Sequence, residues 1–311
     1  MLEKMILPPI LKAGDRVGIV APARKIFKDQ LDASMHTLAS WGLQPRLAQN
    51  IFSTSHSYLA GTDAERRADF QEMIDDPEVK AIFCARGGYG STRIVDDLNF
   101  SKLKSNPKWI IGFSDITALH LRLITMGCAS IHGTMPIFFS KDESASSIES
   151  LQKILFSSSC EIQCTPNAAN RIGHGSGEVI GGNLSLILDA LKTSSEPDTN
   201  YKILVVEEVD EYFYKLDRMF TQLRRIGKLK NLAGLLIGHM TDIKNSELAF
   251  GEDVAQIVMH AVRDYHYPVA FSFPTGHQNP NLAWIHGGNA LLDVTVDHVN
   301  FSYPNIYSKR E

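Results

Sequence analysis

The chain has 311 residues, of which 44% are hydrophobic and 21% charged, and its 35 acidic and 31 basic side chains give a formal net charge of −4. This length predicts two domains rather than one large core. The small net charge gives no support for binding nucleic acid or an anionic membrane, and the apolar runs are far shorter than the roughly 20 residues that span a bilayer.

The N-terminal segment MLEKMILPPILKAGDRV contains only a short apolar piece, carries a Pro pair and lacks a small-residue cleavage site. We therefore expect a lead-in to a first strand rather than an export signal, and a cytoplasmic protein.

The first half of the chain alternates strand-like and helix-like segments. The strand-like segments are RVGIVAPA (16–23), VKAIFCARGGYGS (79–91), KWIIGFSD (108–115) and CASIHG (128–133). The helix-like segments are DQLDASMHTLASWGL (29–43), DAERRADFQEMIDD (63–76), STRIVDDLNF (91–100) and ITALHLRLITMG (116–127). Such alternation predicts an α/β fold, a parallel sheet of the flavodoxin- or Rossmann-like kind with helices on both faces. Ligands of such sheets bind outside the carboxyl ends of the strands.

The second half is less regular and predicts a smaller, mixed, strand-rich domain. Its strand-like segments are KILVVEEVDE (202–211), LAGLLIGHM (232–240), YPVAFSFPTGH (267–277) and one closing strand, NALLDVTVDHVNFSY (289–303). GEVIGGNLSLILDAL (177–191) is typical of a strand, a turn and a helix, and YKLDRMFTQLRRIGKL (214–229) of an amphipathic helix. Between the halves the composition is Ser-rich. We therefore predict an N-terminal domain at 1–140, a linker at 141–173 and a C-terminal domain at 174–311.

The cysteines and histidines do not indicate a metal centre. The four cysteines, Cys84, Cys128, Cys160 and Cys164, fit a reducing compartment. The last two have no second pair to complete a zinc site, and no histidines form a close ligand pair such as H-E-x-x-H. We expect no metal and no cofactor.

The stretch KWIIGFSDITALHL has two interpretations. Ser114 is either a nucleophile on a sharp strand-to-helix turn or, with Asp115, an ordinary cap of the helix that starts near Ile116. Gly112 allows a tight turn, but Ile116 stands where the α/β-hydrolase pattern has a second glycine. The stretch by itself leaves both open.

The second candidate is the glycine loop ARGGYGST, at the end of another predicted strand. Gly87, Gly88 and Gly90 allow backbone amides to approach an anion, so an oxyanion or carboxylate site and a plain turn are both open. The loop matches neither G-x-G-x-x-G nor a P-loop, which argues against a nucleotide-binding oxidoreductase.

An acid and a histidine complete the set. Glu207 follows the apolar run ILVV and needs a partner if it is buried, whereas Glu208 is expected to be solvated or to cap a loop. Among the 11 histidines, His277 lies in a loop rich in Gly, Pro and Asn, with His286 and His132 as competitors. Ser, Glu and His at predicted strand ends are the parts of an acyl-transfer site.

These segments resemble a known family. ARGGYG followed by GFSDIT, together with VVEEVDEYFYKLDRMFTQL and FPTGHQNPNLAWIHGGNALLDV, is similar to the LD-carboxypeptidases, serine peptidase family S66. The resemblance implies that Ser114 is the nucleophile, Glu207 the acid and His277 the general base. It implies oxyanion donors at the backbone amides of Asp115, whose side chain would also cap the helix, and of Gly88.

The resemblance also implies the substrate and the partners. The expected substrate is a murein tetrapeptide that loses its terminal D-alanine during cell-wall recycling, and the expected assembly is a homodimer. Arg86, Gly87 and Arg218 are the candidates for binding the terminal carboxylate. Two alternatives stay open: a microcin C immunity-type peptidase that cleaves an aminoacyl-nucleotide conjugate, and a non-catalytic module that binds a small peptide or anion.

Overall fold

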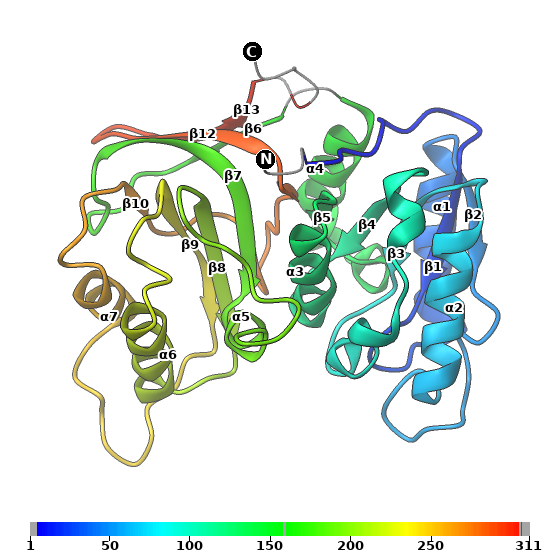
Figure 1. Cartoon of the computed structure of the whole chain (residues 1–311), viewed down its shortest axis with the longest axis horizontal. Helices are drawn as coiled ribbons and strands as arrows, with labels where there is room; N and C mark the ends of the chain where they lie inside the picture. Colours follow the sequence, from blue (N-terminus) through cyan, green and yellow to red (C-terminus); the bar gives the residue numbers. More distant parts are fainter. Residues whose placement is uncertain (1–4, 158–159, 305, 307–311) are drawn as a thin grey trace.

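The computed structural model describes residues 5–157, 160–304 and 306. Within these residues the strands form two sheets that lie side by side, each with helices packed against it (Figure 1). The predicted fold class, an α/β half with a parallel-rich sheet and a mixed, strand-rich half, is confirmed.

The first sheet carries the N-terminal half of the site. In spatial order its described strands are β11 (Trp284–His286), β5 (Ser130–His132), β4 (Trp109–Gly112), β3 (Val79–Cys84), β1 (Arg16–Val20) and β2 (Gln44–Leu47). All neighbours pair in parallel except β11, which is antiparallel to β5. The carboxyl ends of β1, β3 and β4 therefore lie along one edge.

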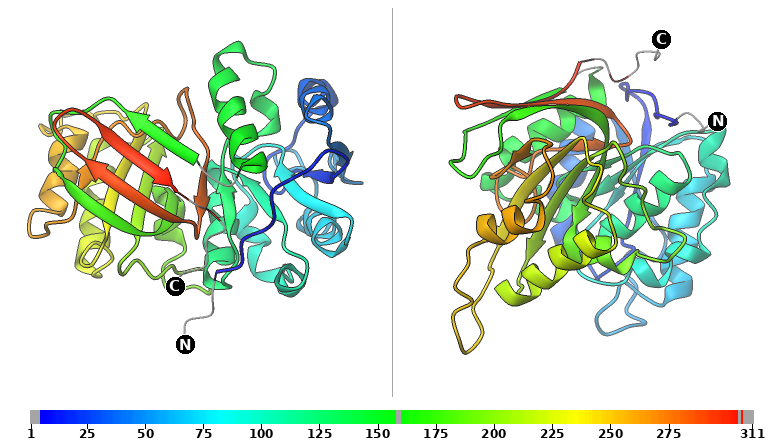
Figure 2. Two further views of the ribbon diagram at one scale, coloured as in Figure 1. Left: turned by 90° about the horizontal axis from the view of Figure 1, so that it is seen from above. Right: turned by 60° about the vertical axis from the view of Figure 1, so that its left-hand side comes forward.

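The second sheet changes from parallel to antiparallel pairing. Its described strands, in order, are β10 (Val269–Ala270), β9 (Gly234–Thr241), β8 (Ile203–Val209), β7 (Gly173–Asn183), β12 (Asn289–Val294), β13 (Val299–Tyr303) and β6 (Cys160–Cys164). The first residues of β7 pair antiparallel with β12 and its last residues pair parallel with β8. Figures 1 and 2 show β7 as the long curved strand that joins the two parts.

Seven α-helices accompany the sheets in the described part of the chain. They are α1 (Asp32–Ser40), α2 (Asp63–Asp75), α3 (Thr117–Thr125), α4 (Ala145–Phe156), α5 (Leu184–Asp189), α6 (Phe213–Arg225) and α7 (Val254–Ala261). A capping box starts α2, because Thr62 accepts from the Glu65 amide while the Glu65 carboxylate accepts from Thr62. Helix α3 packs against β5, β7 and α5, so it connects the two sheets.

Several segments differ from the sequence expectation. Of the strand-like residues 267–277, only Val269–Ala270 form a strand, β10. Residues 91–100 form two 3₁₀ turns, η2 (Ser91–Arg93) and η3 (Val95–Asp97), instead of one helix. The Gly-Gly-Asn expected as a turn continues β7. The single closing strand is a hairpin of β12 and β13, because the Thr295 amide donates to the His298 carbonyl and closes a turn. The Ser-rich segment 141–173 contains α4 and β6, and β6 pairs with β13.

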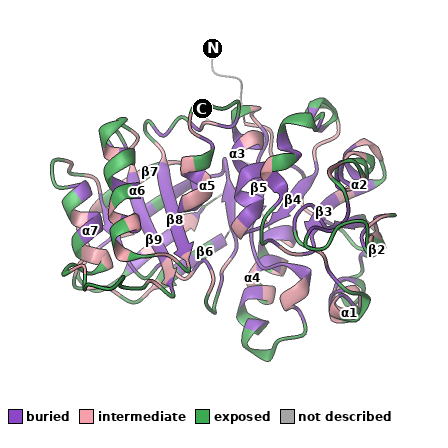
Figure 3. Ribbon diagram, turned by 90° about the horizontal axis from the view of Figure 1, so that it is seen from below, coloured by how far each residue is buried: buried purple, intermediate pink, exposed green. Residues whose placement is uncertain are grey.

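Most strand residues are buried (Figure 3) and belong to two apolar clusters. One apolar cluster combines the first sheet with the strands β12 and β13, and a second lies between β7–β10 and the helices α5–α7. Because β11 comes from the second half and pairs in the first sheet, the two halves of the chain are interleaved. None of the described helices is long and apolar enough to cross a membrane.

Candidate active site

Ser114 lies on a sharp turn between β4 and α3. Its φ is +63°, in the left-handed region that residues other than glycine, Asn and Asp rarely enter. The turn η5 (Ser114–Ile116) follows β4 after one residue and leads directly into α3. Such a conformation costs on the order of 1–3 kcal/mol and persists only where the surrounding structure imposes it. The geometry is that of a side chain held out at the carboxyl edge of the sheet.

Three side chains from distant parts of the chain form one hydrogen-bonded row. His277 Nδ1 lies 2.7 Å from Glu207 Oε2, and His277 Nε2 lies 3.0 Å from Ser114 Oγ. Because an ionised carboxylate only accepts, Nδ1 carries the proton and donates to Glu207, and Nε2 accepts from the Ser114 hydroxyl. The Glu207 side chain is fully buried and the His277 side chain is 19% exposed. Ser114 thus follows a strand of the first sheet and Glu207 lies on β8 of the second, whereas His277 lies in the segment that leads from β10 of the second sheet to β11 of the first.

The environment of His277 favours a charged imidazole. Burial by itself lowers the pKa of His277, but the hydrogen bond to Glu207 and the negative charges of Glu207 and Glu208 outweigh it, so the pKa is raised above 6.5. A base with this shift accepts a proton more readily than an ordinary histidine.

Glu207 and Glu208 point to opposite faces of β8, as successive strand residues must. The Glu208 carboxylate accepts from Asn183 Nδ2 at 2.8 Å and from the amide and hydroxyl of Ser185 at 2.8 and 2.6 Å. Burial raises the pKa of Glu208 and these hydrogen bonds oppose the rise. Glu208 is buried and braces the start of α5, so the expectation that it is solvated or caps a loop is wrong.

The loop that carries His277 is fixed by hydrogen bonds of Asn281 and by the conformation of Gly276, two residues that the sequence did not single out. Asn281 Oδ1 accepts from the Gly276 amide at 2.9 Å and from Thr275 Oγ1 at 3.2 Å. Gly276 has a φ of +119°, and a Cβ there would lie 3.0 Å from Glu207 Oε2. Only glycine allows the loop to approach Glu207 this closely. The sole signal in the sequence is the density of Gly, Pro and Asn in this loop.

The glycine loop lies against the nucleophile through Gly87. A Cβ placed on Gly87 would be 3.1 Å from the Cβ of Ser114 and 3.4 Å from the amide nitrogen of Asp115. Gly88 has a φ of +116° and lies next to Arg24 instead. The Asp115 carboxylate accepts from the Ser91 amide at 2.8 Å. No side-chain cap bond is present at η5 or α3 in this part of the described chain, so the expected Asp115 cap is wrong: its carboxylate satisfies a buried amide of the glycine loop.

Of the two arginines expected to bind the terminal carboxylate, Arg86 lies in the glycine loop and Arg218 lies on helix α6. Arg86 directly precedes Gly87, and its Nη1 donates to the Lys25 carbonyl at 3.2 Å. Arg218 is exposed on α6, with its Cζ 5.9 Å from the centre of the Tyr214 ring.

The competing histidines are core residues. His132 is fully buried, stacks on Trp284 with ring centres 4.9 Å apart, and has Nε2 3.1 Å from Asn281 Oδ1. His286 is fully buried as well and stacks on His120 at 4.4 Å. Burial lowers the pKa of His132 to about 3 and that of His286 well below 6.5. Neither charges near neutral pH.

The chain matches two family models in the same order as its halves. The model of the LD-carboxypeptidase N-terminal domain matches residues 17–133, and that of the LD-carboxypeptidase C-terminal domain matches residues 176–292. The chain belongs to the LD-carboxypeptidase family, serine peptidase family S66. The resemblance stated from the sequence motifs is confirmed, and the protein is a serine-type LD-carboxypeptidase.

Relatives and solved structures agree with the family. The chain is 34% identical to a Bacillus subtilis protein named "Probable murein peptide carboxypeptidase", over 92% of this chain and 91% of that one. It superposes on the crystal structure of muramoyltetrapeptide carboxypeptidase from Oxalobacter formigenes with a TM-score of 0.86 and 27% identity, covering 94% of this chain and 100% of that one. Microcin C7 self immunity protein MccF in complex with aspartyl sulfamoyl adenosine shares the fold, with a TM-score of 0.84 at 20% identity over 95% and 98% of the two chains.

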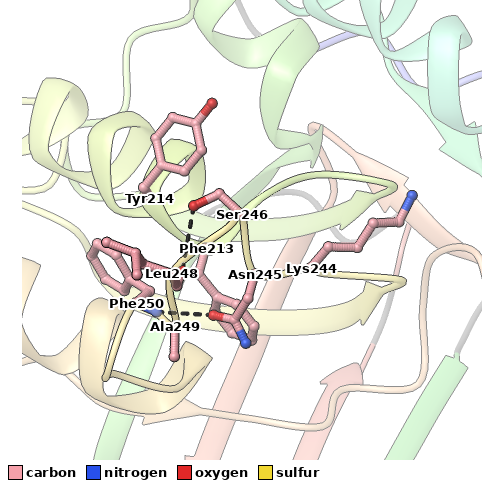
Figure 4. A pocket seen from close by; sticks show the side chains of 8 residues that line it. All are labelled: Phe213, Tyr214, Lys244, Asn245, Ser246, Leu248, Ala249 and Phe250. Carbon is pink, nitrogen blue, oxygen red and sulfur yellow. Dashed lines mark hydrogen bonds between the residues drawn. The ribbon is translucent and has the colours of Figure 1, made fainter.

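A pocket of about 200 Å³ lies beyond the carboxyl ends of β8 and β9 (Figure 4). It is lined by Phe213, Tyr214, Lys244, Asn245, Ser246, Leu248, Ala249 and Phe250. Two hydrogen bonds shape its loop, from the Phe250 amide to Asn245 Oδ1 and from Ser246 Oγ to the Leu248 carbonyl. Ser114, His277 and Glu207 are not among the residues that line this pocket, so the pocket is separate from the candidate reacting atoms.

Proposed function

We propose that the protein hydrolyses the peptide bond between an L-centre and a terminal D-alanine in a murein tetrapeptide, with Ser114, His277 and Glu207 as the catalytic triad. The observation that carries the proposal is the row of hydrogen bonds from buried Glu207 through His277 to the strained Ser114. The names of the Bacillus relative and of the Oxalobacter structure support a murein peptide as substrate.

Acylation begins at the hydrogen bond between Ser114 and His277. His277 Nε2 removes the hydroxyl proton as Ser114 Oγ attacks the scissile carbonyl carbon. Glu207 holds the ring through Nδ1 and stabilises the imidazolium that forms. The developing oxyanion is bound by the backbone amides of Asp115 and Gly88, the latter in the peptide that joins Gly88 to Gly87.

The remaining steps use the same groups. The imidazolium of His277 protonates the leaving amine as the carbon–nitrogen bond breaks, which releases D-alanine and leaves an acyl ester on Ser114. Water then attacks the ester, with His277 again as base, and the tripeptide acid leaves with Ser114 restored. The triad side chains supply every proton transfer in this scheme.

The biological setting is part of the proposal. A substrate of this kind arises when murein peptides are recovered from the cell wall, so we infer a role in cell-wall recycling in the cytoplasm. Assembly as a homodimer stays a prediction.

The deciding experiment follows D-alanine release. Incubating the protein with L-Ala-γ-D-Glu-meso-diaminopimelate-D-Ala is expected to give free D-alanine and the tripeptide by mass spectrometry. The same peptide ending in L-alanine is the control and should remain intact. Intact tetrapeptide after prolonged incubation with folded protein would rule out the proposed substrate.

The pH dependence of this reaction follows from the raised pKa of His277. A general base works only when neutral, so kcat/KM is lost as the pH falls through that pKa. We expect the midpoint of the acid limb to lie above 6.5, the ordinary value for histidine. Glu207→Gln removes the hydrogen-bonded charge, so the limb of its residual activity should move to lower pH. A wild-type midpoint below 6.5 would contradict this environment.

A further inference from the structure

A carboxypeptidase must recognise a carboxylate close to the bond that it cleaves. In the proposed substrate, the carboxylate carbon of the terminal residue is separated from the scissile carbonyl carbon by one nitrogen and one Cα, a distance of about 3–4 Å. A cation that binds this carboxylate must therefore lie beside the glycine loop that contacts Ser114.

Arg24 meets this requirement from the carboxyl end of β1. A Cβ placed on Gly88 would lie 2.9 Å from the Cβ and 3.4 Å from the Cδ of Arg24, whereas a Cβ on Gly87 would lie 3.3 Å from Ser114 Oγ. The two successive glycines thus contact the nucleophile at one residue and the Arg24 stem at the next.

The Arg24 side chain is exposed but its position is supported. Its guanidinium carbon lies 5.3 Å from the centre of the Tyr58 ring, within cation–π range. Its backbone forms an antiparallel bridge with Leu59. The Tyr58 hydroxyl reaches the same place, 3.4 Å from a Cβ built on Gly88. An arginine held in this way loses less conformational entropy when it binds a ligand.

Arg86 adds a second positive charge next to Arg24. Its Nε is buried and has no hydrogen-bond partner among the residues that the structure describes. Burial and the neighbouring charge of Arg24 lower the pKa of Arg86. Arg86 Nη1 donates to the carbonyl of Lys25, the residue after Arg24, which brings the two arginines together.

Arg24 and Arg86 have no acidic partner in the described chain, whereas other arginines near the glycine loop do. Arg66 and Arg93 lie near the same loop, and both form ion pairs with Asp63. Arg66 also donates to the carbonyls of Pro22 and Gly90, which makes it a structural brace. Arg24 and Arg86 form no ion pair within the described residues, so the glycine loop has a local excess of positive charge beside Gly88, the residue after the one that contacts Ser114.

We propose that Arg24, with Arg86 beside it, binds the terminal carboxylate of the substrate and makes the enzyme a carboxypeptidase rather than an endopeptidase. The proposal rests on the proposed function and identifies the group that recognises the leaving residue. Arginine suits the task because its planar fork of donors matches both oxygens of a carboxylate.

The test compares two substrates that differ only in this charge. They are the tetrapeptide ending in D-alanine and the same peptide ending in D-alaninamide, each followed by mass spectrometry of the released amine. Wild-type enzyme is expected to prefer the acid. Arg24→Gln should lower kcat/KM for the acid by about 10- to 100-fold, mainly by raising KM, and leave the amide within about twofold.

Three variants complete the experiment. Arg24→Lys keeps the charge without the fork and should recover part of the preference, and Arg86→Lys tests the second cation while keeping its charge. Arg46→Gln is the matched control, because Arg46 pairs with Glu72 on the exposed surface of α2 and should leave both substrates unchanged.

The outcomes separate this inference from the proposed function. Equal loss for acid and amide in Arg24→Gln would mean a structural role and would overturn the inference. Equal cleavage of acid and amide by wild type would overturn it as well, while D-alanine release would still support the proposed function. If wild type cleaves neither peptide, the proposed function itself fails.

Discussion

Ser114→Ala is expected to lower kcat on the murein tetrapeptide by on the order of 10⁶-fold, the scale seen when a serine nucleophile is removed from a triad. Without Oγ no acyl ester forms, and water must attack the peptide directly with help only from the remaining binding groups. Mass spectrometry of released D-alanine at high enzyme concentration measures the residual rate. Activity within 100-fold of wild type would exclude Ser114 as the nucleophile.

A second substitution at the same position separates catalysis from backbone strain. Ser114→Gly should be equally inactive, yet glycine occupies a φ of +63° without the steric cost that an L-residue meets there. We therefore expect the free energy of unfolding of Ser114→Gly to be about 1 kcal/mol greater than that of Ser114→Ala. Chemical denaturation of the two inactive variants measures the difference. Equal stability would show that the turn stores no strain at this residue.

Local patterns were sufficient to predict where the nucleophile lies. Apolar runs that end in GFSD and ARGG identify two parallel strands, and the carboxyl ends of parallel strands meet at one edge. Ser114 and Gly87 are indeed in contact distance of each other. For the pair of acids, the end of the apolar run ILVV favoured Glu207, but the face of β8 that meets the site depends on where the loop of His277 packs.

Other features depend on contacts between residues far apart in the chain. β11 has three residues and joins the first sheet through pairing with β5, which no local pattern in its sequence indicates. The Ser-rich composition of 141–173 gave no indication of β6, whose backbone pairs with β13, a strand more than 130 residues later in the chain. The contact of Gly88 with Arg24, and the bond from Gly276 to Asn281, likewise arise from tertiary packing.

Glu207→Gln is expected to lower kcat by about 10³- to 10⁴-fold with little change in KM, whereas Glu208→Gln should keep kcat within about tenfold of wild type. The amide at 207 removes the charge that stabilises the His277 imidazolium, and its NH₂ can turn toward Nδ1 and favour the wrong tautomer. Glu208 influences His277 through its charge and not through a hydrogen bond in the described structure, and its carboxylate accepts hydrogen bonds from Asn183 and Ser185.

The order of the two effects should reverse when stability is measured: Glu208→Gln should be the more destabilising of the two substitutions. Glu208 also accepts from the Ser185 amide, and an amide group in its place would direct N–H groups at donors, so we expect Glu208→Gln to lose about 1–3 kcal/mol of unfolding free energy. Initial rates below the melting temperature of each variant keep partial unfolding from being read as lost chemistry. If Glu208→Gln were stable but nearly inactive while Glu207→Gln kept its activity, the acid of the triad would be Glu208. That result would contradict the assignment drawn from the 2.7 Å contact of His277 with Glu207.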